Sequence, residues 1–167
     1  KQRKQLILLI VVLLLLIAGY FGVQKYNEVQ SEKEEASIER VVDVTVDEVT
    51  ELSYEYEGEE LTFVKEEDIW KYKEDTSLSI VQSSIASMIS QIAQMESQGK
   101  IENVTDLSEY GLEEPIKEIS FVADGISYQI AIGDYNSVAD VDYVTVNDSR
   151  IVYAVKTTFQ AAFDYAL

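Results

Sequence analysis

The pattern of hydrophobic and polar residues divides the chain into three stretches. Leu6 to Val23 is an unbroken apolar run that contains no charged and no amide side chain. Gln24 to Arg40 is polar and rich in glutamate. From Val41 onward most apolar residues alternate with polar ones, as in half-buried strands, and one stretch has helical spacing instead. The pattern predicts an N-terminal apolar helix, a charged stalk and an α+β domain built on an antiparallel sheet.

The first half of the domain has the alternation that is typical of strands. We expect a strand over 42–46, then a hairpin over 52–65 that turns near Gly58, and a third strand over 69–72. A helix should follow from Ser79 to Gln98, where apolar residues recur every three or four positions.

The ends of this helix carry recognisable signals. Ser79 and Gln82 have the spacing of a capping box, in which the hydroxyl accepts a backbone N–H and the amide reaches back. Gly99 is expected to end the helix.

The second half repeats this order of elements. A hairpin is expected over 119–132 with its turn at Asp124-Gly125, followed by strands over 141–146 and 151–155. A second helix should then begin at Thr157, which again has the capping-box spacing.

The two halves, 42–98 and 117–167, would therefore be two hairpin–strand–helix units. An internal duplication explains this, but any two α+β halves share part of the pattern.

The apolar run has the length of a transmembrane helix. As a helix, its 18 residues span about 27 Å, close to a hydrocarbon core of about 30 Å, and Lys4 and Lys25 flank it. One alternative is a cleaved signal peptide, whose apolar core is normally shorter and whose small-residue cleavage pattern is interrupted by Tyr20. The other is a buried core helix, which should carry some polar positions.

The charge distribution predicts the orientation. The first four residues carry three positive charges, whereas all 31 acidic residues follow the apolar run. By the positive-inside rule, 1–25 would be a transmembrane anchor with a basic cytoplasmic flank, 26–40 a charged stalk and 41–167 an extracytoplasmic domain. A cytosolic domain, tethered the opposite way round, is the alternative. In either case, the lipid bilayer is a partner through Leu6 to Val23.

Composition excludes many kinds of chemistry. The chain has no His and no Cys, which removes histidine triads, cysteine nucleophiles, thiolate zinc sites and disulfides. Its formal net charge of −18 argues against a nucleic-acid partner, because phosphate groups would be repelled. We therefore expect no catalytic, no cofactor-binding and no metal-binding residue.

Neighbouring acids are the remaining candidates for catalysis. Glu59-Glu60, Glu66-Glu67-Asp68 and Glu113-Glu114 could act as acid and base if a cleft raised the pKa of one carboxyl. Neighbouring residues of a strand or turn usually point apart into water, which is the simpler interpretation. A carboxylate-dependent envelope hydrolase is the enzyme alternative that such a pair would support.

Two further groups of polar residues are candidates for binding. Oxygen side chains near the last strands could hold calcium, although the loop motif DxDxDG is absent and solvated loops are the simpler interpretation. They are Asp134, Asp140, Asp142, Asn147 and Asp148. The central helix has an uncharged polar face that either is solvated or lies against a partner. This face consists of Ser83, Ser84, Ser87, Ser90, Gln91 and Gln94.

Several segments together resemble the bacterial domain of unknown function family 4340. They are LTFVKEEDIWKY, the joint DLSEYGLEEP, the hairpin ending in YQIAIGD, the strand VYAV and the ending AFDYAL. The resemblance covers most of 42–167 and implies a membrane-anchored protein that accompanies ABC-transporter components and gliding-motility-type auxiliary proteins. It implies no catalytic residues. Because members are often longer and this sequence has no initiating Met, we expect it to be part of a longer chain.

These observations favour one function. We expect a membrane-anchored, non-catalytic protein-interaction module outside the cell membrane, with a membrane-protein partner that the resemblance suggests is a transporter component. The alternatives are the envelope hydrolase and a purely structural repeat unit.

Overall fold

The computed structural model describes residue 25, residues 39–156 and residues 158–164. The chain divides into two compact units, Lys1–Ile38 and Glu39–Leu167, and the sheet and its helices belong to the second. The predicted anchor at 6–23 and most of the predicted stalk lie outside the described residues. Within the described ranges, no helix combines the length and the apolar character that crossing a bilayer requires.

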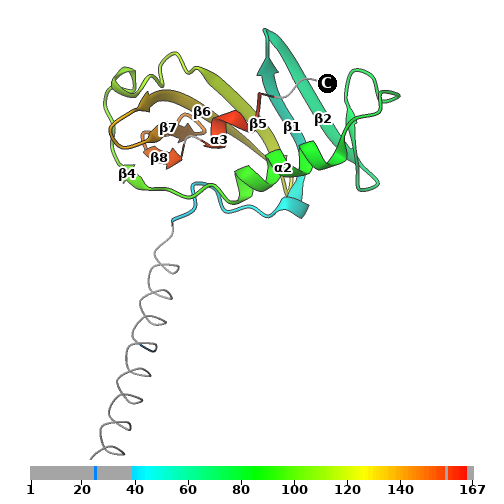
Figure 1. The fold of residues 1–167 in the computed structure, drawn as a ribbon, viewed down its shortest axis with the longest axis horizontal. Helices are drawn as coiled ribbons and strands as arrows, with labels where there is room; N and C mark the ends of the chain where they lie inside the picture. The colour runs from blue at the N-terminus through cyan, green and yellow to red at the C-terminus, as the bar shows by residue number, and fades with distance from the viewer. Residues whose placement is uncertain (1–24, 26–38, 157, 165–167) are drawn as a thin grey trace, which may run out of the picture. The chain divides into compact units, whose positions relative to one another are not determined.

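Eight antiparallel strands form one sheet in the order β3-β2-β1-β5-β6-β7-β8-β4 (Figure 1). Their bounds are β1 Val49–Tyr56, β2 Glu59–Glu66, β3 Ile69–Tyr72, β4 Gly99–Ile101, β5 Lys117–Ala123, β6 Ile126–Asn136, β7 Val141–Val146 and β8 Val152–Lys156. Between Glu39 and Asp164, the described helical elements are few and short: η1 Val46–Glu48, α2 Gln82–Ala93, η2 Ser108–Tyr110 and α3 Thr158–Ala161. The predicted class, α+β with an antiparallel sheet, is confirmed at this level.

The two predicted hairpins are β1–β2 and β5–β6, and their turns are tight. Glu57-Gly58 and Asp124-Gly125 all have positive φ, the conformation that two-residue hairpin turns require. The first strands of the two hairpins, β1 and β5, pair with each other through Leu52↔Phe121 and Tyr54↔Ile119. This long-range pair joins the two halves of the domain into one sheet.

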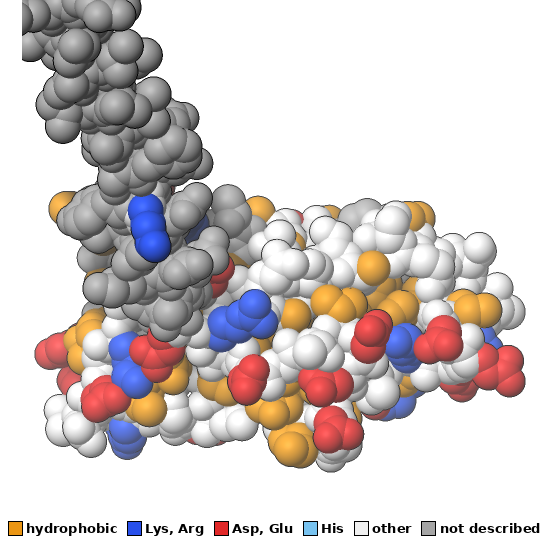
Figure 2. Space-filling view, turned by 90° about the horizontal axis from the view of Figure 1, so that it is seen from below, with side chains coloured by type: hydrophobic (Ala, Val, Ile, Leu, Met, Phe, Trp, Pro, Cys, Tyr) orange, Lys and Arg blue, Asp and Glu red, His pale blue; other side chains and the backbone are white. Residues whose placement is uncertain are grey.

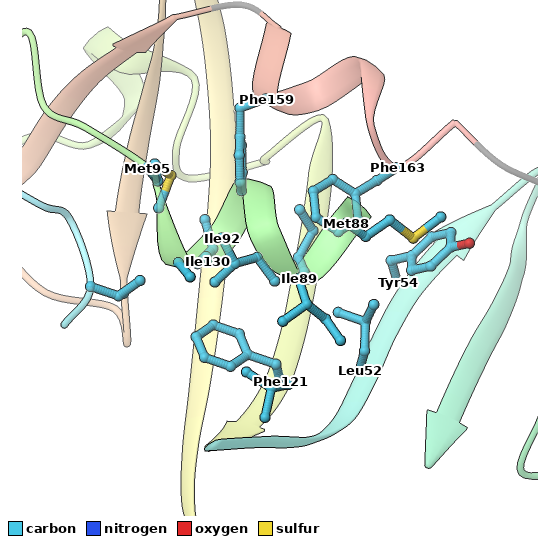
Figure 3. Close-up of a cluster of buried hydrophobic side chains, with 14 of the residues drawn as sticks. Leu52, Tyr54, Met88, Ile89, Ile92, Met95, Phe121, Ile130, Phe159 and Phe163 are labelled. Atoms are coloured by element: carbon cyan, nitrogen blue, oxygen red, sulfur yellow. The ribbon is translucent and has the colours of Figure 1, made fainter. Parts of the chain in front are cut away.

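The main core lies between α2, α3 and one face of the sheet (Figure 3). Ile85, Ile89 and Ile92 of α2 are at most 1% exposed. They meet strand residues such as Leu52 and Phe121 (Figure 3). A Leu or Ile side chain buried in this way contributes about 1.5–3 kcal/mol, so this packing fixes α2 across the sheet. We call this the helix face and the opposite side the outer face.

The start of the domain differs from the prediction. The expected strand over 42–46 is wrong, because Val42 and Val44 belong to an irregular segment and Val46 begins the 3-10 helix η1. Val42 and Val44 are nonetheless buried, at 5% and 4% exposure. Alternating side chains can therefore fill a core from an extended segment that makes no strand ladder.

Helix α2 is shorter than predicted at both ends. Its N-cap is Val81 and no side chain caps it, so the Ser79–Gln82 capping box is wrong. The helix ends at Ala93, and the next residues pair with the start of the domain through Val41 N to Met95 O (2.9 Å) and Ser97 N to Glu39 O (2.8 Å). Gly99 begins β4, a strand that the sequence pattern missed. The competing backbone partner at 39–41 explains the early end of the helix.

Candidate interaction face

Strand register places four small or uncharged polar residues in one row on the outer face. Thr62 pairs with Ser53, Ser53 with Ser120, and Ser120 with Gln129, across β2, β1, β5 and β6. Directly paired residues share a face of the sheet. Helix α2 covers the opposite face, so this row is a polar surface feature, which we call the polar row.

Hydrogen bonds tie the polar row to an acid beside it. The Ser53 hydroxyl donates to Glu60 Oε1 at 2.9 Å and lies 3.1 Å from the Thr62 hydroxyl. Ser53 is 8% exposed although no helix covers it, because neighbouring side chains enclose it. The Glu60 carboxylate is thus held toward the middle of the outer face.

Carboxylates border the polar row without a basic partner. Glu55 of β1 stands directly opposite Glu60 of β2, and Glu118 of β5 lies on the same face two residues before Ser120. In the described part of the chain none of these three makes an ion pair, and like charges at opposed positions are destabilising.

The nearby cation is already engaged. Lys117 binds the Asp164 carboxylate and donates to the carbonyl of Phe163 at 3.1 Å. Lys117 therefore does not form an ion pair with the acid border.

Two open hollows meet on this surface at Ser53 and Ser120. The larger, of about 940 Å³, extends past the β1–β2 turn to Pro115 and Asp164. The smaller, of about 510 Å³, extends over β6 to the turn at Asn147-Asp148. Together with the polar row and its acid border they form one continuous depression, which we call the trough.

The β6–β8 end of the outer face is covered by another segment of the chain. Leu107, Tyr110 and Leu112 of the segment between β4 and β5 pack on Ala131 and Val152 in a second, smaller core. The segment is folded by Asp106, whose Oδ1 accepts the Ser108 backbone N–H at 3.0 Å and also the Ser108 hydroxyl. The hydrogen bond from that hydroxyl, and then the backbone one, lowers the pKa of Asp106.

Two glycines let this segment lie directly on the sheet. Gly111 has φ 66°, in the left-handed region, and a Cβ there would lie 2.8 Å from the backbone nitrogen of Asp134. A Cβ on Gly133 would collide with the carbonyl oxygen of Tyr110. The motifs DLSEYGL and IGD are therefore two sides of one contact. This contact covers the β6–β8 end of the outer face and leaves the trough open.

The candidate acid pairs lie on the surface and divide between faces. All seven of their residues are exposed. Glu60 belongs to the trough, whereas its neighbour Glu59 points to the other side of the strand. Glu66 is engaged by Lys71 at 2.7 Å. The sequence pattern therefore grouped neighbours, while the sheet groups Glu55, Glu60 and Glu118.

The oxygen side chains proposed for a cation do not gather at one place. Asn147 lies at the far end of β7, where its Oδ1 accepts the Gln129 backbone N–H at 2.8 Å. Asp140 accepts the Tyr135 hydroxyl at 2.9 Å at the other end. Across the described ranges, no three His, Cys, Asp or Glu residues are placed to hold a metal ion together.

Asp142 is the exception among these residues, because it is buried. Its residue exposure is 2%, and its Oδ2 has no hydrogen-bond partner among the residues that the structure describes. Desolvation by burial, and then the negative charge of Asp140, raise its pKa above the ordinary value of 3.8.

The uncharged face of α2 lies where the sequence placed it. Ser83, Ser87, Gln91 and Gln94 are exposed, and Ser84 and Ser90 are half-buried. Gln94 Nε2 donates to the Ser90 hydroxyl at 3.1 Å.

Sequence reasoning missed the trough. Ser53 and Thr62 occupy polar positions of the strand alternation, which was a usable signal for an outward face. The pairing of β1 with β5 joins residues 67 positions apart, such as Ser53 and Ser120, and no local pattern reports it.

The fold and this surface define an α+β protein with an eight-stranded antiparallel sheet, one face of which is only partly covered. Residues 70–166, more than half of the chain, match the family described as Domain of unknown function (DUF4340), and the chain belongs to this family. A comparison with curated proteins and a comparison with solved structures each found no match.

Proposed function

We propose that this protein is a membrane-anchored, non-catalytic interaction module that uses the trough to bind a membrane-protein partner. The apolar run Leu6 to Val23 would hold it in the membrane with the N-terminus in the cytoplasm and the acidic domain outside. The family resemblance suggests a component of an ABC-transporter assembly as the partner.

The observation that carries the proposal is the incomplete cover of the outer face. The chain closes the β6–β8 end of that face with its own segment, and leaves a hollowed, acid-bordered surface over β2, β1 and β5. The opposed Glu55 and Glu60 carboxylates would be relieved by a partner that brings basic side chains to them. A partner with Lys or Arg at its contact surface fits this charge.

We also propose that the domain arose by duplication of a hairpin–strand–helix unit. The meanders β1-β2-β3 and β5-β6-β7 support this, because they extend in opposite directions from the antiparallel β1–β5 pair. The unequal continuation, α2 after β3 but β8 and α3 after β7, would be later divergence.

Site-specific photo-crosslinking in native membranes tests the docking surface. A photoreactive residue would replace Ser120 in the trough or, as the control, Gln91 on the exposed face of α2, in the full chain. We expect a discrete adduct from position 120 that contains a membrane protein identified by mass spectrometry, and none from position 91. Adducts from position 91 alone would place the interface on the helix, and no adduct from either would contradict the proposed module.

The orientation has its own test. Protease added to intact spheroplasts should digest the domain. Full protection of the domain until the cells are lysed would overturn the extracytoplasmic placement.

A further inference from the structure

Strand β3 is one edge of the sheet, and only two of its residues point their backbone groups outward. Lys73 N donates to Thr62 O at 2.9 Å, which fixes the alternation of the β2–β3 ladder. Antiparallel residues alternate between bonding the neighbouring strand and facing away from it. The outward residues of the four-residue strand are therefore Trp70 and Tyr72.

A side-chain amide occupies the outward groups of Trp70. Gln82 Oε1 accepts the Trp70 backbone N–H at 2.8 Å, and Gln82 Nε2 donates to the Trp70 carbonyl at 2.8 Å. The carboxamide carries one donor and one acceptor side by side, as a peptide group does. It takes the place that the backbone of a ninth strand would take.

The fold holds Gln82 in this position. It is the first residue of α2, whose Ile85, Met88 and Ile89 are buried on the sheet, so its backbone cannot move away independently. The loop back from β3 is folded by Asp75, whose Oδ1 accepts the Ser77 backbone N–H at 3.0 Å. The two bonds to Trp70 are thus made by an exposed residue at the start of a helix that is packed on the core.

We propose that Gln82 closes the outer edge of β3 against strand addition by a second copy of this chain. An unpaired edge is a template for another strand, and natural sheets block it with specific side chains. Only Trp70 and Tyr72 of β3 point their backbone N–H and C=O groups outward. By binding those of Trp70, the Gln82 carboxamide removes half of the groups that a second strand could bind.

If the β3 edge were open, its geometry would define how the β3 strands of two copies pair. Two β3 strands that pair antiparallel through Trp70 of one copy and Tyr72 of the other have their two-fold axis at Lys71. The two Lys71 residues then stand opposite each other in a position without backbone bonds, with Cα atoms about 4.5 Å apart. That separation suits a disulfide, and the chain contains no other cysteine.

Cysteine trapping therefore reads out edge pairing directly. The full chain would carry Lys71→Cys in detergent solution, alone or combined with Gln82→Ala, and would be oxidised mildly below the melting temperature of each variant. We expect several-fold more disulfide-linked dimer from Lys71→Cys/Gln82→Ala than from Lys71→Cys. Lys71→Cys/Gln91→Ala is the matched control, because Gln91 is an exposed glutamine on the same helix, and should give the background level.

A second variant covers the case in which Gln82→Ala does not fold. Gln82→Glu keeps the length of the side chain but cannot donate to the Trp70 carbonyl, and should also raise the dimer yield above background. Faster hydrogen exchange at the Trp70 amide in Gln82→Ala should accompany the gain. The proposal is overturned if the folded Gln82 variants trap no more dimer than Lys71→Cys alone, or if Lys71→Cys alone already dimerises fully.

Discussion

A single buried carboxylate shows how much one residue can depend on its surroundings. Asp142 lies on the helix face of β7, in register with Tyr135 and Val155, and its Oδ2 is without a partner. A buried acceptor left unsatisfied costs about 1–3 kcal/mol. Burial also disfavours the charged form, so the folded state binds a proton more tightly than the unfolded state does.

The sign of the pH dependence follows from that raised pKa. The contribution of Asp142 to stability falls as the pH rises from about 4, the unfolded value, through the higher folded value. We expect Asp142→Asn to stabilise the chain by about 1 kcal/mol at pH 7 and by much less near pH 4. Urea denaturation at both pH values measures this.

The control removes an equal charge from an exposed position. Asp43 is exposed although its neighbours Val42 and Val44 are buried, so Asp43→Asn should give a difference that changes little between the two pH values. If Asp142→Asn destabilises the chain equally at pH 4 and pH 7, the buried Asp142 carboxylate does not lower the free energy of unfolding as proposed.

At the scale of elements, the segment between β4 and β5 shows how a loop becomes part of the sheet. Tyr110 and Gly111 lie against Gly133 and Asp134, where the pairing of β6 with β7 shifts register. Leu112 then reaches the second core, at 6% exposure. The absence of a Cβ at two places permits this approach.

Gly133→Ala should therefore separate the segment from β6. The added methyl group meets a backbone carbonyl, which cannot swing away as a flexible side chain can. We expect a loss of about 3 kcal/mol, the upper end for overpacking, measured by urea denaturation. Gly99→Ala in β4 is the control, since nothing lies within 4 Å of its added Cβ, and it should cost far less. Equal losses for both variants would argue against the proposed contact.

At the scale of the whole molecule, negative charge is the dominant surface property. The net charge is −18, and acidic side chains lie among basic and apolar ones on the face shown in Figure 2. Several lysines form ion pairs with nearby acids. Lys100 Nζ, for example, lies 2.8 Å from Glu39 Oε1 and 3.0 Å from Glu102 Oε1. The trough acids Glu55, Glu60 and Glu118 are among the described acids that make no ion pair.

Removing one trough acid should stabilise the unbound protein. We expect Glu55→Gln to raise the free energy of unfolding by about 0.5 kcal/mol at low salt, because it no longer opposes Glu60. In 1 M salt, where the screening length is about 3 Å, the gain should shrink. Glu113→Gln, exposed and not among the residues that line the trough, is the control for overall charge and should gain less. A loss of stability in Glu55→Gln at low salt would contradict the proposed repulsion.

Local patterns predicted the elements well where turns and alternation are local. The hairpins and the strands Ile69–Tyr72 and Val141–Val146 are found where the alternation placed them. These features depend on residues close in sequence, whose preferences survive in the fold.

Predictions failed where a distant partner competed for the same residue. Gln82 has the right spacing to cap α2, but binds Trp70 instead because β3 is brought beside it. Residues 94–98 continue the helical pattern, yet their backbone pairs with 39–41. The candidate cation residues lie close in sequence, but strand β7 separates Asp140 at one of its ends from Asn147 at the other.

The sequence alone determined the apolar and acidic character of the chain's parts, its hairpins and its central amphipathic helix, since these follow from composition and from periodicities of two and 3.6 residues. Packing between distant segments sets which hairpins pair, which carboxylates stand opposite each other and which glycines lie against a neighbouring backbone. The reason is that sheet register joins residues far apart in the chain. Each of these contacts needs two segments, and the local sequence of one segment does not specify which other segment it will pair with.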